Sequence, residues 1–504
     1  MSSISYRERQ EDFVSDITGT TPLEVFGLSM SVVLIPSAEY YLKRFFFKGR
    51  FSRLLLEIIF KVVFYYAIET TIVLNRSVVG NSFSLGLVLL WSVMILFIVI
   101  FQKIDKHDEG NITHDENRKL EKSSQHIEFI SEYRHSMQLS TIMAILMVDF
   151  QIFPRRLAKT ENFGYSLMDL GVGSFVFSGA IVSSTARRVV NPSTPRMTFS
   201  KLIHSLLPLT LLAIFRFLSV KTMNYQTHVS EYGVHWNFFT TLVFLCILSY
   251  ITDEVLHLTS SWKKSLIVGT LCALFQQWLL SGPLNLQHII LNGERTNLIL
   301  ANKEGFGTLL GYLSIHLIGV GVGQFTFNYH TMAKQYLKFL IMLTLITTIL
   351  SFAPFYAYGG RWFIEPASHI TEETYHYQIN KEFFDTKDIL FTIFMPSRRM
   401  TNFGYIVWSL SFNITLLTLF YWMSQITPLK NNISRASYTS VVRDAMNFNP
   451  LFSFLFANLI TGAINLFFQT IDASKITSTI IILTYGFVVC LVGVFLYDKK
   501  RKIF

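Results

Sequence analysis

Long apolar segments follow one another along almost the whole chain, and they restrict its fold more than any other feature. We predict about thirteen membrane spans, near residues 24–41, 54–73, 84–102, 137–153, 165–186, 202–220, 234–251, 264–281, 307–325, 337–354, 402–424, 450–470 and 477–497. A helix needs about 20 mostly apolar residues to cross a bilayer. Only 15% of the residues are charged, against about 25% in soluble proteins. The sequence therefore predicts an all-α polytopic membrane protein and excludes both a soluble enzyme and a β-barrel, whose strands alternate apolar and polar residues.

Basic residues predict the orientation of these spans. Short cytosolic loops carry an excess of Lys and Arg, and the loops near 42–53, 103–136 and 187–201 are rich in basic residues. The tail 498–504 is basic as well. Because an odd number of spans places the termini on opposite sides, we predict a cytosolic tail and a luminal polar N-terminus over residues 1–23.

A single multi-span domain is predicted over residues 24–497, with a luminal loop at 355–401. Lys500 and Lys502 fit a spaced dilysine pattern for retrieval to the endoplasmic reticulum; a basic anchor for the last helix is the alternative. The net charge of +10 is assigned to loops beside anionic lipid, so no nucleic-acid partner is expected. The three cysteines lie in apolar segments without CxxC spacing and are predicted to be buried, with no metal site and no permanently bound cofactor. No protein partner can be named.

A carboxylate near the end of the predicted span 137–153 is the first candidate functional group. Placing Asp149 there costs about 2.5–3.5 kcal/mol unless it is neutralised or used. Arg155, Arg156 and Lys159 follow it closely. Pro154 is predicted to end the helix and let this basic turn fold back towards Asp149. A structural ion pair at a helix end is the alternative.

Two further polar groups lie at predicted span ends. Asp169 is expected one turn into the span 165–186, followed by small residues that predict either a packing face or a substrate slot. The next group opens the span at 234–251 and contains Glu231, His235, Trp236 and Asn237. On a helix, residues four apart share one face, so Glu231 and His235 are predicted to lie together.

The remaining candidates are mainly amides, arginines and one acid. Asn302 and Glu304 precede the span at 307–325, and Arg398 and Arg399 precede the span at 402–424. Within the span 450–470, amides at helical spacing form a polar stripe that includes Asn458 and Asn465. The predicted orientation places most of these clusters on the luminal side. Acids, bases and cations beside apolar walls suit a substrate with a polar head and a fatty tail.

Several motifs resemble one known family, the inositol acyltransferases of GPI-anchor biosynthesis (PIG-W/Gwt type), with a fungal-like member as the nearest pattern. The similar stretches are VDFQIFPRRLAKTENFGYSLMDLGVGSFVFSGAIVSS, HVSEYGVHWNFF, ANKEG, SRRMTNFGY and ANLITGAINL. They match in order and spacing along nearly the whole chain. Gln151 stands where the family usually has proline, a minor departure near the site.

The resemblance implies a multi-span enzyme of the endoplasmic reticulum membrane. Such an enzyme would transfer a palmitoyl group from palmitoyl-CoA, its co-substrate, to the inositol 2-hydroxyl of glucosaminyl-phosphatidylinositol. The family's catalytic pair corresponds to Asp149 and Lys159. Antifungal inhibitors of fungal members would be expected to bind the same chamber.

The residues fit this chemistry in more than one way. Asp149 could act as general base while Lys159 steadies the oxyanion, or Lys159 could mainly position Asp149. Arg155 and Arg156 suit phosphate groups, and the other candidates are predicted to bind or surround substrate. Two alternatives remain open: a lipid transporter that makes no bond, and a membrane-bound O-acyltransferase in which His235 is the base.

Overall fold

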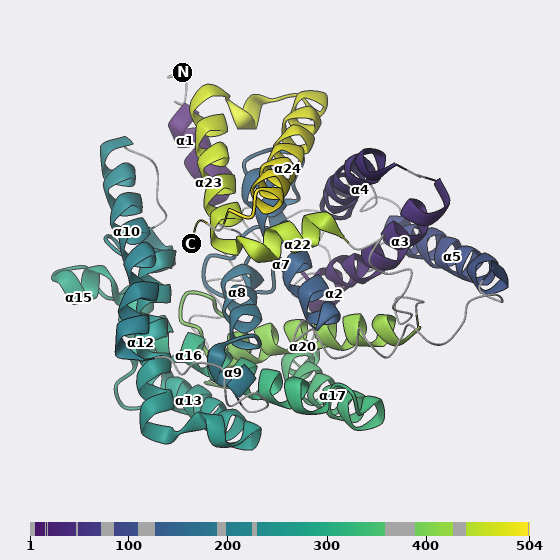
Figure 1. Ribbon diagram of the computed structural model, residues 1–504. Coiled ribbons are helices and arrows are strands. Elements are labelled where there is room, and N and C mark those ends of the chain that lie inside the picture. The colour runs from purple at the N-terminus through teal and green to yellow at the C-terminus, as the bar shows by residue number, and fades with distance from the viewer. Residues whose placement is uncertain are drawn as a thin grey trace. The chain divides into compact units, whose positions relative to one another are not determined.

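The computed structural model describes residues 6–46, 49–71, 85–108, 127–188, 198–223, 229–357, 389–426, 440–501 and 503, apart from residues 16 and 18. Within these ranges every regular element is a helix (Figure 1), and an isolated β-bridge joins Thr20 to Tyr165. The predicted all-α class is confirmed for this part of the chain.

Eight helical stretches among the described residues are long and apolar enough to cross a membrane, and a bent helix pair makes a possible ninth. They are α2 to α3 (Pro22–Phe46), α10 (its part Phe199–Phe217), α12 (Phe238–Leu256), α16 (Lys303–Tyr329), α17 (its part Ala333–Phe352), α20 (its part Phe403–Gln425), α23 (Pro450–Phe467), α24 (Lys475–Asp498) and the pair Trp262–Ser281 with Leu286–Asn292. The other four predicted spans coincide with α4 (Arg50–Thr71), α5 (Leu85–Asp108), α7 (Glu128–Met147) and α8 (Leu170–Ala180). None of them is among the eight stretches, and Trp91–Lys103 of α5 is a shorter apolar helix. A polytopic membrane protein is thus supported, while the count of thirteen and the orientation stay predictions.

The other helical elements precede the first span, form part of the composite spans 22–46 and 262–292, or connect one span to the next. They are α1 (Tyr6–Val14), α2 (Pro22–Met30), η1 (Ser31–Leu34), α3 (Ile35–Phe46), η4 (Arg155–Leu157), α9 (Ser184–Arg188), α11 (Val229–Tyr232), η5 (Leu258–Ser260), α13 (Trp262–Ser281), α14 (Leu286–Asn292), α15 (Leu298–Ala301), α19 (Ile389–Phe394), α22 (Val441–Phe448) and η8 (Thr470–Asp472). In full, α10 runs Phe199–Met223, α17 Ala333–Ala357 and α20 Phe403–Ile426.

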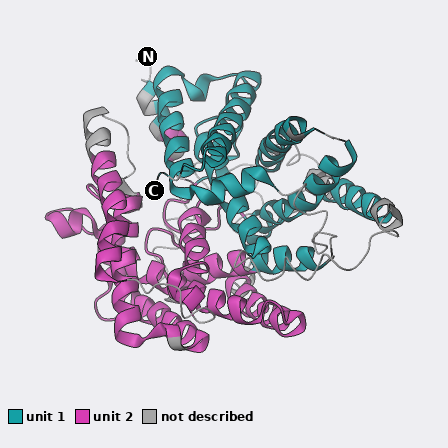
Figure 2. Ribbon diagram, viewed as in Figure 1, with its two compact units in different colours: residues 1–10, 21–158, 415–504 teal, residues 11–20, 159–414 magenta. Residues whose placement is uncertain are grey.

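The helices form two compact units, coloured separately in Figure 2. The first unit comprises residues 1–10, 21–158 and 415–504, and the second comprises 11–20 and 159–414. The chain leaves the first unit after Ala158, between Asp149 and Lys159. The predicted site residues are therefore divided between the units, and each group is described within its own unit.

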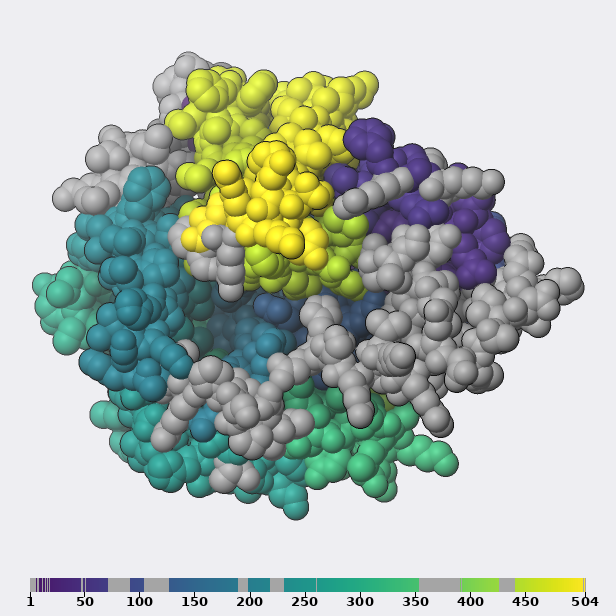
Figure 3. Space-filling model, in the orientation of Figure 1, coloured from purple at the N-terminus to yellow at the C-terminus, as the bar shows by residue number. Residues whose placement is uncertain are grey.

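In the first unit, α24 packs against α4, α7, α22 and α23, and Figure 3 shows the surfaces of α23 and α24 side by side. Gly486 allows the close approach, since a Cβ there would lie 2.9 Å from both Met143 and Val62. This unit also buries charge. Lys43 Nζ donates to Glu39 at 2.5 Å and to Glu57 at 2.6 Å, all three nearly inaccessible to solvent. Such pairing allows these charged side chains of α3 and α4 to be buried.

In the second unit, α16 is the central helix and contacts α8, α9, α12, α13 and α17. Its small residues let neighbouring backbones approach closely. A Cβ at Gly323 would lie 2.4 Å from the carbonyl oxygen of Ile181, so only glycine fits there. The N-terminus of α16 carries Glu304, and α20 begins just after the arginine pair. The starts of α16 and α20 therefore position several of the candidate site residues in the second unit.

Candidate active site

Asp149 lies in a turn directly after α7, in the first unit. The helix ends at Met147, and the backbone N–H of Asp149 donates to Leu146 O at 3.2 Å. The prediction that Pro154 ends this helix is wrong, because the chain has already turned before it and Pro154 precedes the short helix η4 in extended backbone. The Asp149 side chain is half-buried, and Asn465 Nδ2 donates to its Oδ2 at 2.7 Å. One member of the polar stripe on α23 thus fixes the candidate base.

Of the three cations in the predicted basic turn, Arg155 folds back onto the end of α7. Arg155 Nη2 donates to Val148 O at 2.5 Å, which satisfies a carbonyl left unpaired at a helix C-terminus. Burial lowers the pKa of Arg155 to about 10, and the Asp149 carboxylate acts in the opposite direction. Arg156 instead pairs with Glu24, Nη2 to Oε1 at 2.7 Å. Sequence analysis missed Glu24, although an acid in the first turn of α2 is a recognisable signal.

The second amide of the stripe has a local partner. Asn458 Nδ2 donates to Phe454 O at 2.8 Å, one turn back in the same helix. Thr470, which lies beyond the end of α23, donates to Asn465 Oδ1 at 3.4 Å. A role for Asn458 in substrate binding stays a prediction.

Asp169 lies in the second unit, and its carboxylate accepts three hydrogen bonds. It is the N-cap residue of α8, so the prediction of a position one turn inside a helix is wrong. Its Oδ2 accepts from Thr160 N at 3.2 Å and Thr160 Oγ1 at 2.6 Å, and its Oδ1 accepts from Arg398 Nε at 2.9 Å. Tyr405 Oη donates to its backbone carbonyl at 2.7 Å. These contacts join α8 to the segments beside Thr160 and Arg398.

Lys159 and Glu231 form the exposed end of the same network. Lys159 Nζ lies 2.7 Å from Glu231 Oε1, and Arg398 Nη2 lies 3.9 Å from that oxygen. Burial alone would lower the pKa of the Arg398 guanidinium, but the Glu231 and Asp169 carboxylates outweigh it and raise that pKa above its usual value. Arg398 therefore stays a cation between two carboxylates. Asp149 belongs to the other unit, so its pairing with Lys159 stays a prediction.

Glu231 and His235 do not share a helix face, contrary to expectation. The helix α11 ends at Tyr232, and Gly233 has a φ of +114°, which a residue with a Cβ rarely adopts. His235 lies beyond this break, where its backbone N–H donates to Asn302 Oδ1 at 2.8 Å. Its exposed ring lies 5.7 Å from the Phe217 ring, centroid to centroid.

Trp236 and Asn237 precede α12 and bond to residues in its first turn. Asn237 is its N-cap, with Oδ1 accepting from Thr240 N at 3.1 Å, which satisfies one unpaired donor of the helix. Trp236 Nε1 donates to Thr241 Oγ1 at 2.8 Å. Its ring covers Gly305, where a Cβ would come within 2.4 Å of the indole. Both residues have local structural roles, and substrate contact by either stays a prediction.

Glu304 and Arg399 lie in one cluster with Arg295, which the sequence analysis did not single out. Arg295 Nη2 lies 2.5 Å and Arg399 Nη2 lies 3.2 Å from Glu304 Oε1, and the carboxylate is fully buried. Arg399 Nη1 also donates to Asn162 at 2.9 Å. Lys303 donates to carbonyls at the end of α14. Two guanidinium groups therefore bind one carboxylate, and the nearby Lys303 adds a third cation, leaving an excess of positive charge.

Asn402 holds the turn that carries the arginine pair. Its Oδ1 accepts from Ser397 N at 2.9 Å and Tyr405 N at 3.0 Å, while its Nδ2 donates to Thr392 O at 2.8 Å and Met395 O at 2.7 Å. The side chain is fully buried. Both ends of one amide are thus used to fix a loop before α20.

We expect Asn402→Ala to destabilise the protein by about 2–4 kcal/mol, because buried backbone groups would lose their partners. Thermal unfolding of the detergent-solubilised protein measures the loss. Asn458→Ala is the control, since that amide donates to a carbonyl of its own helix, Phe454 O. Equal melting temperatures for the two variants would contradict the structural role of Asn402.

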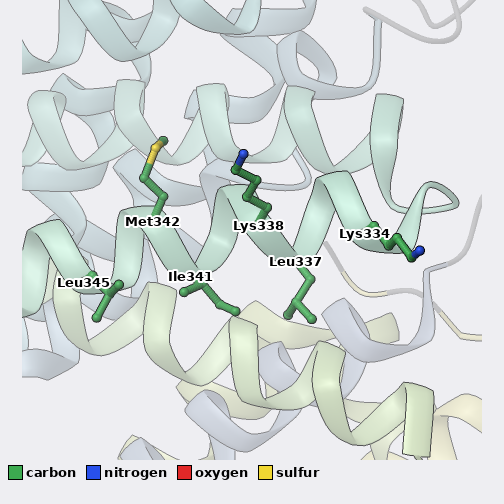
Figure 4. Close-up of a pocket in the computed structure, with 6 residues that line it drawn as sticks. All are labelled: Lys334, Leu337, Lys338, Ile341, Met342 and Leu345. Atoms are coloured by element: carbon green, nitrogen blue, oxygen red, sulfur yellow. The ribbon is translucent and has the colours of Figure 1, made fainter.

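An open groove runs along α17, away from these clusters in the sequence. Figure 4 shows its lining residues, which are Lys334, Leu337, Lys338, Ile341, Met342 and Leu345. An apolar face with lysines at one end is typical of a lipid-facing helix, whose lysines reach towards the headgroups. None of the predicted site residues lines the groove, so we do not assign the chemistry to it.

Comparison with known proteins identifies the family. The GWT1 family model matches residues 6–496. The chain belongs to the GWT1 family. A GWT1 relative from Candida albicans, "GPI-anchored wall transfer protein 1", is 32% identical over all of this chain and 99% of its own length. "Phosphatidylinositol-glycan biosynthesis class W protein" from Dictyostelium discoideum is 32% identical over 98% of each chain. The predicted resemblance is thereby confirmed, and the GWT1 match includes every predicted site residue.

Proposed function

We propose that this GWT1-family protein is an enzyme of GPI-anchor assembly. It transfers a palmitoyl group from palmitoyl-CoA to the inositol 2-hydroxyl of glucosaminyl-phosphatidylinositol. The names of the relatives support the pathway. The observation that carries the chemistry is Asp149, a half-buried carboxylate held on one oxygen by the Asn465 amide. A half-buried carboxylate that is fixed in place by such a contact suits a general base.

The reaction needs one proton transfer and one exchange of bonds. Asp149 takes the proton of the inositol hydroxyl while the inositol oxygen attacks the thioester carbon. The C–S bond then breaks, an ester forms, and the CoA thiolate leaves and takes up the proton that Asp149 accepted. Lys159 steadies the oxyanion during the attack or tunes Asp149, and both roles use its ammonium. No serine or cysteine lies in a nucleophile-elbow motif, so direct transfer is favoured over an acyl-enzyme.

Substrate recognition follows the charges. Arg155 and Arg156 suit phosphate oxygens of the CoA or of the lipid head, and both lie within seven residues of Asp149 in the sequence. The excess positive charge around Glu304 suits an anionic head as well. The palmitoyl chain lies between helices, since burying each methylene contributes about 0.8 kcal/mol.

The proposed location is the endoplasmic reticulum membrane, with a luminal N-terminus and a cytosolic C-terminus. The basic tail and loops support this orientation. We expect a C-terminal tag to be cleaved by protease added to sealed microsomes. A protected tag would reverse the orientation and place the polar clusters on the cytosolic side.

A mass-spectrometric assay tests the proposed function directly. Purified protein is incubated with palmitoyl-CoA and glucosaminyl-phosphatidylinositol. The expected product is the lipid heavier by one palmitoyl group, formed together with free CoA. Movement of the lipid across proteoliposome membranes without acyl-CoA, and no acylated product, would favour a transporter instead.

A further inference from the structure

Lys159 is held at two points by residues of its own unit. Its ammonium lies 2.7 Å from Glu231 Oε1. Its neighbour Thr160 bonds Asp169 through both the backbone N–H, at 3.2 Å, and the side-chain hydroxyl, at 2.6 Å. One contact therefore orients the end of the side chain, and the other fixes the backbone from which that side chain extends.

Arg398 connects the two carboxylates that make these contacts. Its Nε lies 2.9 Å from Asp169 Oδ1, and its Nη2 lies 3.9 Å from Glu231 Oε1. Removing one partner of a buried ion pair leaves an uncompensated charge. The positions of Asp169 and Glu231 are therefore coupled through one guanidinium.

Exposure rises along this series of contacts from the support to the ammonium. The side chains of Asp169 and Arg398 are only 2% and 7% exposed, whereas that of Lys159 is 42% exposed. Groups so deeply buried and already bound to each other are poorly placed to meet a substrate. The accessible ammonium is the group that can.

We propose that Asp169, Arg398 and Glu231 are positioning residues for Lys159. Asp169 fixes the backbone beside Lys159, Glu231 orients its ammonium, and Arg398 locks the two carboxylates together. This replaces the expectation that all three bind substrate. The expected effect on kcat rests on the proposed function, whereas the expected effect on the position and accessibility of the Lys159 ammonium does not.

The kinetic test uses Glu231→Gln, which keeps the size of the side chain but removes its charge. We expect kcat to fall about tenfold or more with an unchanged KM, because misplacing a catalytic group by about 1 Å can cost about 100-fold. In a Lys159→Ala background the same substitution should have little further effect, as residues acting through one another are not additive. Equal losses in both backgrounds, or a rise in KM alone, would overturn the proposal.

A chemical test works without any acyltransferase activity. The full-length protein is treated with an amine-reactive acetylating reagent, and labelling of Lys159 is measured by mass spectrometry relative to the exposed Lys334. Freed from its ion pair, Lys159 should be labelled severalfold faster in Glu231→Gln. Glu294→Gln, at an exposed glutamate of the same unit, should change nothing. An unchanged ratio in Glu231→Gln would overturn the proposal, whereas an inactive wild-type enzyme would overturn only the proposed function.

The side-chain hydrogen bond from Thr160 to Asp169 is tested by a variant that changes no charged residue. Thr160→Val removes the hydroxyl that donates to Asp169 and preserves the shape of the side chain. We expect kcat to fall severalfold at unchanged KM and normal expression, and Thr160→Ser should restore it. Wild-type kcat in Thr160→Val would show that Asp169 does not act on Lys159 through this contact.

Discussion

Replacing Asp149 with Asn should lower the rate of acyl transfer by about 10²–10⁴-fold, the usual cost of losing a general base. Asn is nearly isosteric with Asp, and its carbonyl oxygen can still accept the hydrogen bond from Asn465. The protein should therefore stay folded while the proton of the inositol hydroxyl loses its acceptor. Single-turnover formation of palmitoylated lipid, measured beside the melting temperature, separates loss of chemistry from loss of protein.

Two companion variants sharpen this prediction. Asn465→Leu removes the amide that fixes Asp149 and should have a smaller effect on rate, because the carboxylate remains. His235→Ala tests the rival base and should retain most of the activity. A folded Asp149→Asn protein that binds palmitoyl-CoA and keeps more than about a tenth of normal turnover would have far more activity than loss of a general base leaves. In that case Asp149 is structural and His235 becomes the leading base.

Lys159→Ala should lower the rate by about 10²–10³-fold, the usual cost of removing one oxyanion donor. The side chain is substantially exposed, so its truncation should leave the melting temperature nearly unchanged. Turnover at saturating substrate is the measurement. Lys334→Ala, which removes another exposed lysine of the same unit, is the control for a general change of charge.

The double variant distinguishes the two roles of Lys159. If Lys159 steadies the oxyanion, its removal should slow the reaction further in the Asp149→Asn background. If it mainly positions Asp149, the double variant should be no slower than Asp149→Asn alone. A folded Lys159→Ala enzyme with wild-type turnover would contradict both roles and leave the ion pair with Glu231 purely structural.

Local sequence patterns predicted the helices better than their ends. Among the described residues, eight of the predicted spans, or nine with the bent pair, are helices long and apolar enough to cross a membrane, because hydrophobicity summed over about 20 residues is a strong signal. The ends depend on single backbone positions. The positive φ of Gly233 stops α11 before His235, and α7 ends at Met147 without help from Pro154.

The sequence by itself determined the membrane class and most of the polar groups that matter, since a charge near an apolar span is costly and therefore conspicuous. Only the tertiary structure decided their partners. Arg156 pairs with Glu24, and Arg398 with Asp169, 132 and 229 residues away along the chain. Helix packing, and not local periodicity, brings such residues together, so no pattern within a window of sequence can reveal which acid meets which base.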